Sequence, residues 1–167
     1  MPKINDIVSY GAQGVCKITG MTEKSFGDTV LEYYVLEPIY QHNSTIFVPV
    51  NNKKLVEKMR SVLTKEEITE MLHRISLEET IWIEDELLRR QHHQEIIAGG
   101  DRAALLSAIK ALYLHKKEQL AKGKKLHQAD ERFFKEAEDL LYHEFALVLE
   151  LDPTEVLPFI ISQIEEQ

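Results

Sequence analysis

The chain has a single cysteine, Cys16, among its 167 residues, so it cannot form an internal disulfide. We therefore expect a reduced intracellular protein in which Cys16 is a half-buried thiol on a strand. A reactive thiol would need a base close by, and the residues beside Cys16 supply none.

The sequence also lacks long apolar runs and the common catalytic motifs. No run of about 18 apolar residues occurs, so no membrane span is predicted. Residues 1–6 lack the apolar stretch of a signal peptide, which favours the cytoplasm. There is no GxSxG, Walker loop, GxGxxG after a strand or CxxC. We therefore expect no enzymatic activity, no cofactor and no small-molecule substrate.

Negative charge prevails, but it is unevenly distributed. The net charge of the chain is −8. Residues 1–60 hold seven Lys and Arg against six Asp and Glu, a balance of +1, and residues 61–167 hold thirteen against twenty-two, a balance of −9. Because attraction to phosphates is the main source of nonspecific nucleic-acid affinity, the acidic part requires any DNA contact to come from a local basic face.

The first fifty residues are typical of strands. Four β-prone runs, at residues 6–10, 14–18, 32–36 and 45–50, are separated by turn residues. In residues 31–36, Leu31, Tyr33 and Val35 point one way and the residues between them the other, as expected for a strand. We predict a small curled antiparallel sheet or an SH3-like barrel, and take the Tudor/SH3-like antiparallel β-barrel as the fold of this part. Pro49 cannot donate to a ladder, so it should lie at the sheet edge or at a strand end.

From about residue 51 onward the pattern is helical. Residues 64–67 and 76–79 have the Ser/Thr-x-x-Glu spacing of capping boxes. Gly99-Gly100 should end a helix, Asp101 should cap the next one, and Asp152-Pro153 should open another.

A buried helix face is indicated by Phe134, Ala137, Leu141, Phe145 and Val148, which recur at intervals of three and four residues. We expect about five helices packed as a small bundle. The predicted fold class is therefore α+β, with a β-domain at residues 1–58 and an all-α domain at residues 59–167.

Seven histidines raise the possibility of a metal site. His92 and His93 are adjacent, so on a helix they diverge by about 100° and do not readily share an ion. Asp139 and His143 lie four residues apart but have no third partner in the pattern, which favours a solvated pair. We expect no metal, and a metal-dependent enzyme using His92, His93 or His143 stays an alternative.

Basic residues cluster in two predicted helices. If these helices form a hairpin, their cations would make one positive strip in an acidic domain; otherwise they are ordinary solvated residues. Trp82, the only tryptophan, is by default a packing residue of the core or between domains, and its functional reading is a wedge against nucleic-acid bases. The strip would comprise Arg89, Arg90, Lys110, His115, Lys116 and Lys117, followed by Lys122, Lys124 and Lys125 in the connection.

Several segments, in order and spacing, resemble the CarD/CdnL family. They are Asp6–Tyr10, Gly14–Ile18, Glu32–Glu37 and Ile46–Val50, followed by Arg89-Arg90, Gly99–Arg102, Lys110–Tyr113 and residues 137–146. The first four also resemble the polymerase-interacting domain of the bacterial transcription-repair coupling factor. No single motif is diagnostic, and the likeness extends over nearly the whole chain.

The resemblance implies a transcription regulator without enzymatic turnover. Its Tudor-like N-terminal domain would bind the β subunit of RNA polymerase edge to edge between sheets. Its helical domain would contact promoter DNA, weakly or locally, and stabilise the open complex. The implied polymerase-binding residues are Lys24, Ile46, Phe47, Val48 and Pro49, and the implied DNA-binding residues are Trp82, Arg89, Arg90, Lys110, Lys116 and Lys117.

The sequence departs from the family at two of these positions. Well-known members carry arginine at the position of Phe47, so the polymerase contact would be more apolar here. The family's DNA-wedging tryptophan aligns with Glu86, and Trp82 lies one helical turn earlier. An alternative therefore stays open, in which the protein binds polymerase and bridges it to another protein without touching DNA.

Overall fold

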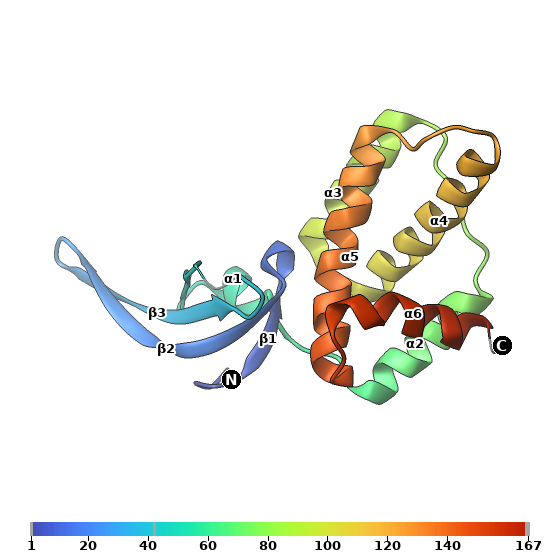
Figure 1. The fold of residues 1–167 in the computed structure, drawn as a ribbon. Coiled ribbons are helices and arrows are strands. Elements are labelled where there is room, and N and C mark those ends of the chain that lie inside the picture. The colour runs from blue at the N-terminus through green and yellow to red at the C-terminus, as the bar shows by residue number, and fades with distance from the viewer. Residues whose placement is uncertain (1, 42, 166–167) are drawn as a thin grey trace. The chain divides into compact units, whose positions relative to one another are not determined.

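The computed structural model describes residues 2–41 and 43–165 (Figure 1). The chain divides into two compact units, residues 1–62 and residues 63–167. We call them the sheet unit and the helical unit, and each has a hydrophobic core of its own.

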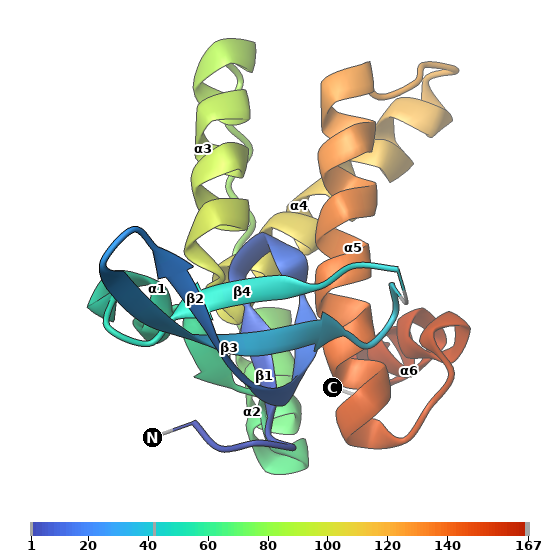
Figure 2. The same cartoon turned by 90° about the vertical axis from the view of Figure 1, so that its left-hand side faces the viewer.

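The sheet unit contains five strands in the order β4-β3-β2-β1-β5, and every neighbouring pair is antiparallel. Figure 2 shows β4, β3 and β2 lying side by side. The elements are β1 (Ile7–Tyr10), the 3-10 turn η1 (Gly11–Gln13), β2 (Val15–Phe26), β3 (Thr29–Pro38), β4 (Ile46–Pro49), the short helix α1 (Lys53–Glu57) and β5 (Met59–Ser61).

The antiparallel sheet is confirmed, and it is open rather than closed into a barrel. Strands β4 and β5 are its two edges, and no pairing within the described residues joins them. The sequence does not predict β5, whose three residues pair with β1. This pairing places residues 59–61 in the sheet unit, beyond the boundary expected at residue 58.

The β2–β3 hairpin is longer than the sequence suggests. Its turn consists of Gly27 and Asp28 alone, with Gly27 at a φ of 64°, a conformation that glycine adopts without strain. The tip pairs Phe26 with Thr29, whereas β4 pairs only with Tyr33–Leu36 of β3. The distal half of the hairpin is therefore a two-stranded ribbon that extends past the rest of the sheet (Figure 1).

One face of the sheet holds the core of this unit. Its fully buried residues include Cys16, Ile18, Leu36 and Val48, with Val8, Tyr34 and Met59 alongside. Cys16 is fully buried, not half-buried, and burial raises the pKa of its thiol to about 11. The thiol therefore stays protonated at neutral pH. Pro49 ends β4 at the sheet edge, as predicted.

The helical unit contains the five expected helices. They are α2 (Lys65–Leu77), α3 (Glu86–Gly99), α4 (Arg102–Ala121), α5 (Gln128–Leu149) and α6 (Pro153–Glu165). The predicted buried face of α5 is confirmed at Ala137, Leu141 and Phe145, which pack with residues of the other four helices. No helix in the described part of the chain is long and apolar enough to cross a membrane.

Most predicted helix ends are confirmed. Thr64 and Glu67 form a reciprocal capping box, Gly100 is a left-handed C-cap, and Asp101 accepts hydrogen bonds from the first amides of α4. The capping box predicted at residues 76–79 is wrong. Ser76 lies inside α2, where its hydroxyl donates to the carbonyl of His73, and Asp85 caps α3 instead.

Candidate functional site

The outer edge of β4 offers unpaired backbone groups. The Val50 amide donates to the Glu32 carbonyl at 3.0 Å, so backbone groups of every second residue face β3. The amide and carbonyl of Phe47 therefore point away from the sheet, as does the carbonyl of Pro49, which accepts a hydrogen bond from the Asn52 amide at 3.2 Å. Because Pro49 has no N–H, Phe47 is the one residue of β4 that presents both a donor and an acceptor outward.

The sheet face that does not hold the core carries an apolar cluster around Lys24. The Lys24 ammonium lies 3.6 Å from the Phe47 ring centroid and 5.6 Å from that of Tyr33. The two rings meet edge to face, with centroids 6.3 Å apart. Phe26, two residues after Lys24, shares this face and is 57% exposed, and Phe47 is 41% exposed.

These four residues and the edge of β4 form what we call the β4 surface. The family resemblance implies Lys24 and Phe47 as polymerase-binding residues, but it does not point to Phe26 or Tyr33. The sequence does not reveal the strand register: the pairing of β2 with β3 places Lys24 opposite Leu31, next to Tyr33 along β3, and Phe26 opposite Thr29 on the same face. Of the other predicted residues, Val48 is buried in the core and Ile46 packs against it, so both position the strand.

In the helical unit, Arg89 is an interior residue that is 4% exposed. Its guanidinium donates to both carboxylate oxygens of Asp130, at 2.9 and 2.8 Å. It also donates to the carbonyl oxygens of Ile83 at 2.9 Å and Glu84 at 3.4 Å. One side chain thus ties α3 to α5 and to the α2–α3 connection, residues 78–85.

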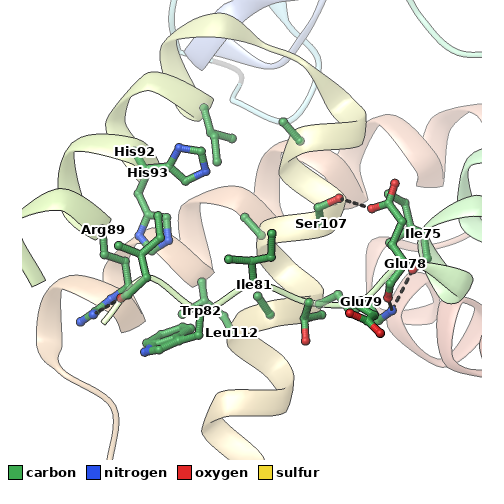
Figure 3. Close-up of a pocket in the computed structure, with 17 residues that line it drawn as sticks. Ile75, Glu78, Glu79, Ile81, Trp82, Arg89, His92, His93, Ser107 and Leu112 are labelled. Atoms are coloured by element: carbon green, nitrogen blue, oxygen red, sulfur yellow. Dashed lines mark hydrogen bonds between the residues drawn. The ribbon is translucent and has the colours of Figure 1, made fainter. Parts of the chain in front are cut away.

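Trp82 lies in this connection, before α3 begins at Glu86. Its ring stacks on His115 of α4, with centroids 3.7 Å apart and planes 10° apart. The guanidinium carbon of Arg89 lies 4.6 Å from the Trp82 ring centroid, and Figure 3 shows both side chains beside the same pocket. A wedge role would require Trp82 to leave these contacts.

Lys110 also serves the interior of the unit. Its ammonium donates to the carbonyl oxygens of Ile75 at 2.8 Å, Ser76 at 3.4 Å and Glu78 at 2.7 Å. These acceptors lie at the C-terminal end of α2, where carbonyls lack partners within the helix and cations are favoured. Lys110 of α4 therefore caps α2.

The remaining predicted cations lie at the surface. Arg90 donates to Glu86 at 3.4 Å and is half exposed, as is its partner. The Lys116 ammonium lies 5.8 Å from the Phe134 ring centroid, and Lys117 is exposed. Trp82 and Arg89 thus contact each other and Lys110 caps α2, whereas the side chains of Arg90, Lys116 and Lys117 reach solvent.

The histidines in the described part of the chain do not converge on a metal site. Within residues 2–41 and 43–165, no three His, Cys, Asp or Glu side chains gather as metal ligands. His93 is buried, with its ring stacked on Phe133 at 3.8 Å. Burial lowers its pKa to about 4, and nearby Asp130 opposes the shift. Burial also lowers the pKa of His143, against the opposing effect of Asp139.

Comparison with known families gives one match. Residues 3–63 match the family model described as the CarD-like/TRCF RID domain. The match covers the sheet unit and the first residue of the helical unit, and it does not extend to residues 64–167. No curated protein matches the chain significantly.

Proposed function

Residues 3–63 form a CarD-like/TRCF RID domain, which implies interaction with RNA polymerase, and from this premise we propose a transcription regulator that docks through the β4 surface. Its target would be the β subunit. Proteins of this family are generally regulatory and non-catalytic. The observation that carries the proposal is the open edge of β4, with Phe47 directing its amide and carbonyl outward.

The geometry supports docking by strand addition. An incoming strand can pair with the amide and carbonyl of Phe47, while flanking side chains select the partner. The paired edge is short, because Pro49 has no amide and β4 ends there. Backbone pairing alone would therefore be weak, and we assign much of the affinity to the neighbouring side chains.

The Lys24 cluster supplies those side chains. Phe26 and Phe47 are large apolar groups exposed to solvent, and covering them with a partner would remove apolar area from water. The Lys24 ammonium, lying over the Phe47 ring, adds a charge for an acidic group on the partner. The β4 surface thus combines an apolar anchor with one cation.

We further propose that the helical unit contacts promoter DNA and stabilises the open complex. The supporting residues are Arg90, Lys116 and Lys117, whose side chains reach solvent. A regulator of this kind needs only a difference in affinity between the two promoter states. A difference of about 1.4 kcal/mol would shift the equilibrium tenfold.

A second candidate function, a protein-bridging adaptor without DNA contact, is favoured by one observation. Trp82, Arg89 and Lys110 are occupied within the helical unit by stacking, a buried ion pair and a helix cap. The acidic balance of residues 61–167 also opposes DNA binding. In this alternative the β4 surface keeps its role, and the helical unit would bind another protein.

The docking proposal is tested by titrating the full chain against purified RNA polymerase and against its isolated β subunit. Phe47→Glu should weaken binding at least tenfold, because it places an acidic group on the β4 surface. The matched control is Val30→Glu, an equally apolar-to-acidic change at an exposed position on the opposite face of the hairpin. Equal binding by the two variants would contradict docking through the β4 surface.

The DNA proposal is tested by the lifetime of promoter open complexes. The double variant Lys116→Glu/Lys117→Glu should shorten the lifetime gained from the wild-type protein. The control, Lys53→Glu/Lys54→Glu, makes the same charge change at two exposed lysines of α1. If the first variant still binds polymerase and leaves the lifetime unchanged, the adaptor function replaces the DNA-contacting one.

A further inference from the structure

A cavity of about 450 Å³ lies within the helical unit, between α3, α4 and the connection of residues 78–85 (Figure 3). This volume is in the range of roughly 300–1,000 Å³ that small-molecule sites occupy. Neither the β4 surface nor Arg90, Lys116 and Lys117 line it. The cavity is therefore separate from the surfaces of the proposed function.

The walls of the cavity are mainly apolar. Small residues of α4, at positions 104, 108 and 111, leave the space that larger side chains would fill. Ile96 of α3 and Leu112 of α4 add aliphatic surface. Ile81 stands at the cavity wall with 84% of its surface exposed, and an occupant would cover it (Figure 3).

The wall carries two cations and two carboxylates, and both cations are already paired. Arg89 is bound by Asp130 and two carbonyls, and Lys110 by three carbonyls. Glu78 accepts a hydrogen bond from Ser107 at 3.3 Å, and Glu79 is the second carboxylate. A negative occupant would find no uncommitted cation, and a positive occupant would meet Arg89 and Lys110 as well as the two carboxylates. The wall therefore favours a neutral occupant.

We infer that this cavity is a binding site for a neutral, mainly hydrophobic small molecule. The aliphatic floor and Ile81 remove its apolar part from water. At the wall, the imidazole of His92 can donate or accept, and the Ser107 hydroxyl, whose proton is donated to Glu78, can accept, so both can serve a single polar group on the ligand. The site is distinct from polymerase docking, so each can fail without the other.

A pair of related dyes tests the inference on the full chain. N-phenyl-1-naphthylamine is neutral, and 8-anilinonaphthalene-1-sulfonate has the same ring system with a negative charge. Trp82, the only tryptophan, lines the cavity and serves as the energy donor. The neutral dye should bind saturably, one per chain, with energy transfer from Trp82, and the sulfonate at least tenfold more weakly. Unsaturable binding, or equal affinity for both dyes, would overturn the inference.

Two variants place the dye in the cavity. Ala108→Phe fills the space and should weaken binding of the neutral dye at least tenfold, while Ala121→Phe at the exposed end of the same helix should not. If circular dichroism shows that Ala108→Phe does not fold, Ile81→Ser at the exposed rim replaces it. That change should weaken binding at least threefold, against no effect of Leu77→Ser, which is exposed outside the wall. Unchanged binding by a folded cavity variant would refute the site.

Discussion

The two units each contain a cation next to an aromatic ring, in opposite surroundings. In the sheet unit, the Lys24 ammonium lies 3.6 Å from the Phe47 ring centroid, and both residues are exposed. In the helical unit, the Arg89 guanidinium lies 4.6 Å from the Trp82 ring centroid, and Arg89 is 4% exposed. The same chemical pair therefore serves two purposes, which burial distinguishes.

The difference lies in what else each cation contacts. Arg89 has lost its water and replaced it with Asp130 and two backbone carbonyls, so removing it would leave a buried carboxylate unpaired. Lys24 keeps its water, and an exposed contact of this type contributes only about 0.5–1 kcal/mol. Replacing each cation by methionine, which keeps a long apolar side chain, measures this contrast directly.

The largest effect is expected for Arg89→Met. It leaves Asp130, which is 3% exposed, without its bidentate partner and should reduce the free energy of unfolding by about 3–5 kcal/mol. Urea unfolding of the helical unit, followed by the fluorescence of Trp82, measures the change. A loss below about 1 kcal/mol would contradict the conclusion that the Arg89–Asp130 pair holds α3 and α5 together.

The double variant Arg89→Met/Asp130→Leu is the internal control. Because an apolar pair of similar volume often replaces a buried ion pair at little cost, it should regain much of the lost stability. A double variant no more stable than the single one would assign the loss to packing around Trp82 and to the Ile83 and Glu84 carbonyls instead.

The second largest effect is expected for Lys110→Met. The ammonium donates to three carbonyls at the end of α2, and hydrogen bonds from charged groups contribute about 1.5–3 kcal/mol. The free energy of unfolding should fall by about 2 kcal/mol. Lys117→Met, seven residues later at an exposed position, should stay within about 0.5 kcal/mol of wild type. Similar values for both would contradict the capping role of Lys110.

The sequence predicts the fold better than the site because fold signals are local. Alternation in β3, the Thr64 capping box and the spacing along α5 each involve residues within a few positions, and each is confirmed. The sequence does not decide between an open sheet and a closed barrel, because closure depends on whether β4 meets β5. Three-residue β5 carries too little pattern to be recognised before its pairing with β1 is known.

The candidate site depends on partners far apart in the chain. Arg89 and Lys110 look like surface cations because their acceptors, Asp130 and the end of α2, lie 41 and about 35 residues away. Because a basic residue is usually exposed, the sequence predicts both side chains at the surface, whereas both bind groups inside the helical unit. The burial of Asp130 is not predicted either, since no feature of the neighbouring sequence marks this carboxylate as buried. Phe26 was missed because its face is fixed only by the register of β2 against β3.

The stability of the protein should depend on pH through His93, because this histidine is buried and its pKa is shifted. Burial lowers its pKa from 6.5 to about 4, with His92 and Arg89 adding to the shift and Asp130 opposing it. The unfolded chain therefore binds the proton first, so stability is complete above pH 6.5 and is lost as pH falls toward 4. The slope due to this one group approaches about 1.4 kcal/mol per pH unit at most.

His93→Phe isolates this contribution. Phenylalanine preserves the ring that stacks on Phe133 but cannot take up a proton. Carboxylates titrate in the same window, so the relevant quantity is the difference in unfolding free energy between wild type and variant. It should be constant above pH 6.5 and change by about 1 kcal/mol per pH unit below it. A difference that stays constant down to pH 4 would contradict the buried, neutral state of His93.

The smallest effect on stability is expected for Lys24→Met, which completes the methionine series. The ammonium over Phe47 is exposed and screened by water, so the free energy of unfolding should change by no more than about 0.5–1 kcal/mol. Polymerase binding should nevertheless weaken several-fold, because Lys24 lies at the centre of the β4 surface. The two measurements separate a docking residue from a structural one. Arg89→Met should lower the free energy of unfolding strongly and leave polymerase binding unchanged. Lys24→Met should weaken polymerase binding and leave the free energy of unfolding nearly unchanged. If Lys24→Met binds polymerase as well as wild type, the Lys24 ammonium does not contribute to docking, and only the aromatic rings and the edge of β4 remain as the docking surface.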